Sequence, residues 1–105
     1  LLAMLAGAPP AMAQQPGDNL NDTQVLGRQL LAQSCGICHL SPSLGAKTYG
    51  PVLNKASTAG SDDAMRAYIV NGTERMPAFK YHLKPAEIDA IIASVRTVPA
   101  PAARP

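Results

Sequence analysis

The sequence predicts a small all-α domain, and three observations support this fold class. Apolar residues recur at helical spacing in three segments, near 21–34, 61–71 and 85–96. No segment shows the apolar and polar alternation of a β-strand. The 105 residues include three Tyr, one Phe and no Trp, so a core built from side chains alone would be thin. We therefore expect a bound cofactor, a metal or a disulfide to supplement it.

The first predicted helix begins near Asn21 and runs to about Ser34. Asn21 and Gln24 have the spacing of a capping box, in which each side chain satisfies the backbone N–H of the other residue. Gly27 would allow another backbone to approach this helix closely. Three leucines are expected on one face, namely Leu26, Leu30 and Leu31.

The second and third predicted helices also carry recognisable ends. Ser61 is a good N-cap for the second, and Asn71-Gly72 supplies its C-terminal stop. The third starts with Pro85 at its first helical position and ends near Arg96. Its apolar face is the most regular in the chain and consists of Ile88, Ile91, Ile92 and Val95. The segments 35–59 and 73–82 between the helices are expected to be irregular.

The two ends of the sequence are expected to lie outside the folded domain. Residues 1–13 resemble the remnant of a secretory signal peptide, because an apolar run too short to span a bilayer leads to the small residues Ala11 and Ala13. We expect a linker at 14–20, a domain at 21–98 and a disordered Pro/Ala tail at 99–105. The signal predicts an exported, soluble protein in an oxidising compartment such as the periplasm.

The charge of the chain argues against two classes of partner. Nine Lys and Arg against seven Asp and Glu give a formal charge of +2, without a run of like charges. This distribution favours neither nucleic acid nor stable insertion into a membrane.

Cys35-Gly36-Ile37-Cys38-His39 is the most specific motif in the sequence, because C-x-x-C-H is the attachment pattern of haem c. Two thiols at this spacing can form thioethers with the vinyl groups of one porphyrin, and His39 then lies beneath the iron. A thioredoxin-type dithiol would need a βαβ setting, and a structural zinc site would need more Cys or His ligands. A plain disulfide would not need His39. The motif thus predicts one covalent haem c with His39 as an axial ligand of the iron.

A haem iron that only carries electrons needs a second axial ligand. Met76, followed by the rigid Pro77, is the favoured candidate. Met65 lies within a helical pattern and is expected in the core. His82 remains the alternative ligand. A neutral thioether sulfur favours Fe(II), so Met76 predicts a positive reduction potential.

In order along the chain, these motifs resemble those of class I c-type cytochromes, in particular the small single-haem bacterial kind. The likeness runs from Gly27 to Val95 and includes three markers besides the haem motif, which are Gly50-Pro51-x-Leu53, Asn71-Gly72 and Met76-Pro77-Ala78-Phe79. The resemblance implies the cytochrome c fold, with three main helices and loops wrapped around one covalent haem. It implies an electron carrier and not an enzyme, without catalytic residues.

The resemblance also assigns roles to single residues. The Pro51 carbonyl would accept a hydrogen bond from the His39 ring. The side chains of Leu53 and Phe79 would line the haem crevice. Gly27 would lie where the two terminal helices cross. This chain departs from the family at that crossing, where Leu31 and Ser94 replace a frequent aromatic pair. The helix contact is therefore expected to be weaker.

Similar cytochromes accept electrons from periplasmic dehydrogenases and pass them to a terminal oxidase or another cytochrome. The resemblance therefore implies a monomeric shuttle between such redox proteins. Four lysines could surround the exposed haem edge or simply add solubility, namely Lys47, Lys55, Lys80 and Lys84. Two alternatives remain: a haem subunit fixed within a dehydrogenase complex, and a ligand sensor or peroxidase in which Met76 is displaceable.

Overall fold

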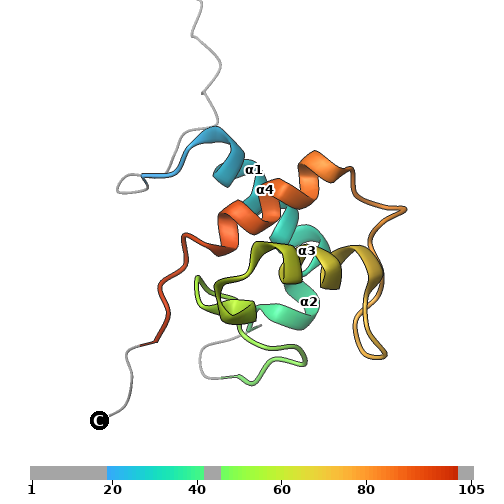
Figure 1. Cartoon of the computed structure of the whole chain (residues 1–105). Helices are drawn as coiled ribbons and strands as arrows, with labels where there is room; N and C mark the ends of the chain where they lie inside the picture. The colour runs from blue at the N-terminus through green and yellow to red at the C-terminus, as the bar shows by residue number, and fades with distance from the viewer. Residues whose placement is uncertain (1–18, 42–45, 102–105) are drawn as a thin grey trace, which may run out of the picture.

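A computed structural model describes residues 19–41 and 46–101, and within these ranges the chain is helical and contains no strand. Four α-helices follow one another, α1 (Asp22–Ser34), α2 (Gly36–His39), α3 (Asp62–Asn71) and α4 (Pro85–Val95), with a 3₁₀ turn, η1 (Ser57–Gly60), before α3. The three long helices are those that the sequence predicts (Figure 1). The predicted signal remnant at 1–13 and most of the predicted linker lie outside the described residues.

The predicted helix starts are confirmed by their capping contacts. The Gln24 N–H donates to Asn21 Oδ1 over 2.8 Å, and the Asn21 N–H donates to Gln24 Oε1 over 2.9 Å. Ser61 Oγ accepts from the Ala64 N–H at the start of α3. These bonds satisfy N–H groups that have no partner within the helix, so they fix where each helix begins.

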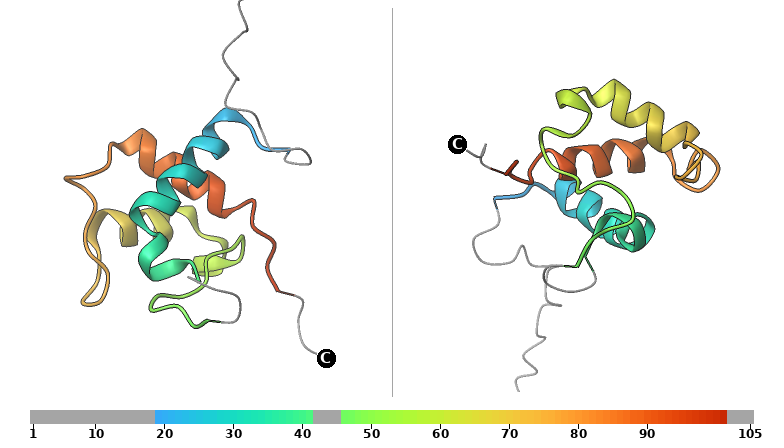
Figure 2. Two further views of the ribbon diagram at one scale, coloured as in Figure 1. Left: turned by 180° about the vertical axis from the view of Figure 1, so that it is seen from behind. Right: turned by 90° about the horizontal axis from the view of Figure 1, so that it is seen from below.

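Helices α1 and α4 cross in contact and form the centre of the fold (Figures 1 and 2). A Cβ added at Gly27 would lie 1.8 Å from the Ala90 carbonyl oxygen, so only a glycine permits this approach. Ser94 is buried at the same crossing, and its Cβ would be 2.9 Å from the added atom. The expected role of Gly27 as the small residue at the helix crossing is confirmed.

The core follows α4, whose four predicted apolar residues are all buried. Leu31 of α1, both Met65 and Ile69 of α3, and Cys35 also belong to it. Of the three leucines expected on one face of α1, Leu31 is buried whereas Leu26 is 44% exposed. The stripe that faces α4 is centred on Gly27 and Leu31, one turn apart, and Leu26 lies to its side.

Two short elements were not expected from the sequence. Helix α2 continues almost directly from α1, with the His39 N–H donating to the Cys35 carbonyl over 3.0 Å. Turn η1 contains Thr58 and Ala59 at φ 56° and 52°, a left-handed conformation that non-glycine residues seldom adopt. Both elements have four residues, which is too short to give a periodic apolar pattern.

No helix in the described ranges is both long and apolar enough to cross a lipid bilayer.

Candidate functional site

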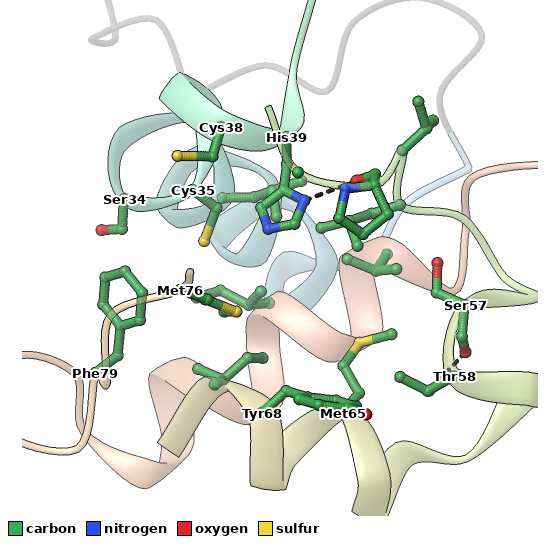
Figure 3. Close-up of a pocket in the computed structure, with 18 of the residues that line it drawn as sticks. Ser34, Cys35, Cys38, His39, Ser57, Thr58, Met65, Tyr68, Met76 and Phe79 are labelled. Carbon is green, nitrogen blue, oxygen red and sulfur yellow. Dashed lines mark hydrogen bonds between the residues drawn. The ribbon is translucent and has the colours of Figure 1, made fainter. Parts of the chain in front are cut away.

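A cavity of about 770 Å³ lies beside the core, and the structure brings all seven predicted site residues to its wall. Helix α2 and the following loop form one side, α3 and the Met76 segment form another, and Ile91 and Val95 of α4 contribute apolar surface. The seven are Cys35, Cys38, His39, Pro51, Leu53, Met76 and Phe79 (Figure 3 labels five of them).

His39 is held in one orientation by the loop that follows it. Its Nδ1 lies 2.7 Å from the Pro51 carbonyl oxygen, and the side chain is almost fully buried. A carbonyl can only accept, so Nδ1 carries the proton and donates, which leaves the lone pair on Nε2. A Cβ at Gly50 would lie 2.8 Å from His39 Cε1, and the Gly50 N–H donates to the Cys38 carbonyl over 2.7 Å. The loop thus leaves no room for the ring to move toward Gly50.

The two cysteines are both free and both face the cavity (Figure 3). Burial raises the pKa of the Cys35 thiol, and the neighbouring Cys38 raises it further. The raised pKa of Cys35 is opposite in direction to the lowered thiol pKa that activates a thioredoxin-type cysteine. The residues within 19–41 and 46–101 also include no group of three or more His, Cys, Asp or Glu side chains that could hold a metal ion.

Met76 reaches the cavity from a tight turn that begins at Gly72. Gly72 has φ 68°, and a Cβ there would lie 2.4 Å from the Met76 carbonyl oxygen. The Thr73 N–H donates to that same oxygen over 2.8 Å. The Phe79 N–H donates to the Ile69 carbonyl over 2.9 Å, which ties the end of this segment to α3. These contacts fix the backbone on both sides of the Met76 sulfur.

The two alternative ligand candidates differ in where they lie. Met65 is 4% exposed and belongs to the core, as predicted, but it also lines the cavity (Figure 3). His82 does not line the cavity, and its ring instead meets the Phe79 ring edge-on with centroids 6.5 Å apart. The structure therefore leaves two thioethers at the cavity wall and removes the competing imidazole from it.

Loop 55–61 contributes Ser57 and Thr58 to the cavity wall, and Arg96 at the C-terminus of α4 holds this loop in place. Figure 3 places Ser57 and Thr58 on the side away from the two cysteines. Arg96 donates to the Ser57 carbonyl over 2.8 Å, to the Lys55 carbonyl over 3.0 Å and to Asp62 over 2.7 Å. The sequence predicts Arg96 only as a charge near the end of α4, because contacts with residues 34 to 41 positions away leave no local pattern.

Other lining residues were not predicted from the sequence. Tyr68 lies one helical turn after Met65 on α3, so both side chains are on the face of α3 that lines the cavity. This i, i+3 spacing was the one feature of the sequence that could have indicated Tyr68 as a lining residue. Tyr49 and Arg75 line the cavity from two separate loops, and no spacing connects them. None of the four lysines proposed around the haem edge lines the cavity.

The cavity fits a covalently attached haem in three respects. Its volume lies within the range of roughly 300–1,000 Å³ that is typical of cofactor sites. Its wall is mainly apolar and holds two thiols, an imidazole and thioether sulfur, which is the donor set of haem c. Gly50 leaves space for the ring of His39, which a Cβ would occupy.

The helical fold and this cavity define a c-type cytochrome, a class of one-electron carriers that are typically not enzymes. A family model described as "Cytochrome C oxidase, cbb3-type, subunit III" matches residues 22–93. The chain belongs to this cytochrome c family, whose members carry covalent haem c, and its two cysteines are consistent with that attachment.

Solved structures support the same fold. The chain is similar to the c-type cytochrome SorU from Sinorhizobium meliloti, with 30% identity and a TM-score of 0.56 over 73% of this chain and 91% of that chain. It is also similar to cytochrome c6 from the diatom Phaeodactylum tricornutum, with 26% identity and a TM-score of 0.54 over 69% of this chain and 88% of that chain. A comparison with curated proteins found no significant match.

Proposed function

We propose that this cytochrome carries single electrons through one haem that is bound by thioethers at Cys35 and Cys38, with His39 and Met76 as the axial ligands. The observation that carries the proposal is the convergence of these four side chains on one cavity, from α2 with the Cys35 that precedes it and from the Met76 turn. When bound, the haem supplies a one-electron Fe(III)/Fe(II) couple.

His39 and Pro51 act together in this proposal. The hydrogen bond from Nδ1 to the Pro51 carbonyl orients the ring and keeps Nε2 available as a donor. The same bond raises the electron density of the imidazole. Because Gly50 has no Cβ, the ring fits closely against this loop and is held in the orientation that the hydrogen bond sets.

Met76 and the residues around it form the side of the cavity opposite His39. Phe79 and Leu53 are partly buried against the core and line the cavity, so they exclude water from the redox centre. Water exclusion keeps the dielectric constant low and, together with a neutral sulfur ligand, favours Fe(II) and a positive potential. If His39 and Met76 both hold the iron, no position would be left for a substrate, and outer-sphere electron transfer is the expected activity.

The proposed partners are other redox proteins outside the cytoplasm, with a periplasmic dehydrogenase as donor and a terminal oxidase or another cytochrome as acceptor. Two observations support this proposal: the signal-like sequence at 1–13, and the oxidase subunit in the description of the matched family. We propose that the protein acts as a monomer.

The ligand assignment is tested by replacing each of the two thioethers that line the cavity. The protein is matured with covalent haem, and the oxidised form is examined for the weak Met-to-iron band at the red end of its spectrum. Met76→Ala is expected to abolish this band, whereas the matched Met65→Leu variant keeps it. Loss of the band in Met65→Leu and its persistence in Met76→Ala would show that the wrong sulfur has been assigned.

The carrier role is tested by mixing the reduced protein with an oxidised c-type cytochrome or a purified terminal oxidase in a stopped-flow instrument. Complete reoxidation at a rate that rises with acceptor concentration is expected. Failure to exchange electrons with every c-type acceptor, combined with fast peroxide turnover, would favour a haem enzyme.

A further inference from the structure

Tyr49 and Arg75 form a contact between two loops that lie far apart in the sequence. Arg75 Nε lies 3.3 Å from the Tyr49 hydroxyl oxygen, and its guanidinium carbon lies 4.7 Å from the centroid of the Tyr49 ring. The two residues are 26 positions apart, and both line the cavity. One side chain thus receives both a hydrogen bond and a cation–π contact from the other.

Each partner is attached directly to a proposed ligand segment. Tyr49 immediately precedes Gly50 and Pro51, which hold the His39 ring in place. Arg75 immediately precedes Met76, and its own N–H donates to Thr73 Oγ1 over 3.2 Å within the same turn. The contact therefore joins the backbone on the His39 side of the cavity to the backbone on the Met76 side.

The Met76 turn has a fixed connection to α3 at each end, through Gly72 and Phe79, and both connections lie on one side of the cavity. The Tyr49–Arg75 contact connects this turn to the opposite wall. A second cation–π pair, Lys80 and Tyr81, has a comparable geometry at 5.2 Å. Those two residues are adjacent in sequence and do not line the cavity, so they join no separate segments.

We propose that Tyr49 and Arg75 are a latch between the two ligand loops, which keeps the Met76 segment closed and so limits access of small external ligands to the metal. The inference rests on the proposed ligation by Met76. Tyr49 and Arg75 are positioning residues, because they act on the redox centre through the loops that they join. Tyr49 is 60% exposed, so the contact between the two side chains is accessible to solvent and is weaker than a buried contact.

The test measures how fast imidazole binds to the oxidised, haem-loaded protein, since imidazole can bind the iron only after Met76 has moved away. Tyr49→Leu removes both parts of the contact, and Arg75→Gln removes the cation but leaves the Tyr49 ring in place. Each is expected to accelerate binding about two- to fivefold, the factor that corresponds to one exposed cation–π contact. Arg75→Lys keeps a cation and is expected to restore most of the wild-type rate. Tyr81→Leu is the matched control and should leave the rate unchanged.

Two further measurements separate a latch from a general loss of stability. The double variant Tyr49→Leu/Arg75→Gln should bind imidazole no faster than the faster single variant, because both changes break the same contact. The midpoint of global unfolding should change no more in Tyr49→Leu than in Tyr81→Leu. Acceleration in Tyr49→Leu without acceleration in Arg75→Gln would overturn the latch, since it would mean that Tyr49 acts only as a steric cover.

The Met76→Ala background distinguishes failure of the latch from failure of the ligand assignment. In this background imidazole should bind rapidly, and Tyr49→Leu should add nothing. If Met76→Ala binds imidazole no faster than the wild type, Met76 is not the ligand and the proposed function itself fails. If Met76→Ala binds rapidly but Tyr49→Leu alone binds at the wild-type rate, the ligand stands and the latch is rejected.

Discussion

Gly27→Ala is the substitution for which the structure gives the clearest energetic expectation. The added Cβ would lie 1.8 Å from the Ala90 carbonyl oxygen, more than 1 Å closer than the 3.0 Å that such contacts need. The obstacle is the backbone of α4, so no side-chain rotation can relieve it and the two helices must separate. Overpacking of this kind costs about 3 kcal/mol, while the better helix propensity of Ala returns about 1 kcal/mol. We therefore expect a net loss of about 2 kcal/mol in the free energy of unfolding.

The measurement is guanidinium unfolding of the haem-loaded protein, followed by far-UV circular dichroism. Gly36→Ala is the matched control, because a Cβ at Gly36 would make only ordinary van der Waals contacts, the nearest with the flexible end of Leu40 at 3.4 Å and another with the Leu31 carbonyl oxygen at 3.8 Å. The control should change the free energy of unfolding by no more than about 0.5 kcal/mol. If Gly27→Ala proves as stable as Gly36→Ala, the close crossing of α1 and α4 is refuted.

Two further substitutions test the walls of the cavity. Gly50→Ala would place a Cβ 2.8 Å from the His39 ring, so we expect the ring to be displaced and the reduction potential to shift. An unchanged potential in a spectroelectrochemical titration would argue against the close fit of the His39 ring to Gly50. Arg96→Gln removes charged hydrogen bonds to Asp62 and to two backbone carbonyls and should lower the free energy of unfolding by about 2 kcal/mol. Arg66→Gln is the control for Arg96→Gln, since the exposed ion pairs of Arg66 are worth less than about 1 kcal/mol. If the two variants lose equal free energy of unfolding, in thermal or chemical unfolding, Arg96 does not stabilise loop 55–61.

The helices could be predicted because their signals are local. The capping pair Asn21 and Gln24, the N-cap Ser61 and the Pro85 start each act within four residues, and the structure confirms all three. The four apolar residues of α4 repeat regularly because one face of that helix forms the core. The spacing of Leu26 predicts that it shares a face with Leu30 and Leu31. The sequence alone could not show that the partner helix leaves Leu26 44% exposed.

Only part of the cavity could be predicted from the sequence. Residues that form a contiguous motif could be identified, whereas residues brought together from distant positions in the chain could not. The haem motif is contiguous, so it marks Cys35, Cys38 and His39 without any knowledge of the fold. Met76 could be ranked only by its Pro77 context, and the assignment of one sulfur over the other remains a prediction. Arg96 and the left-handed backbone of η1 left no sequence signal, because the contacts that stabilise this loop come from a helix about 40 residues later.

The most direct test of the account is the mass of the exported, matured protein, recorded together with the spectrum of its oxidised and reduced forms. The account predicts the mass of the mature polypeptide plus one haem, resistance of that haem to extraction by acidified organic solvent, and the spectrum of low-spin, six-coordinate iron in both redox states. A polypeptide without added mass after successful export and maturation, or iron that is five-coordinate in the resting protein, would contradict it.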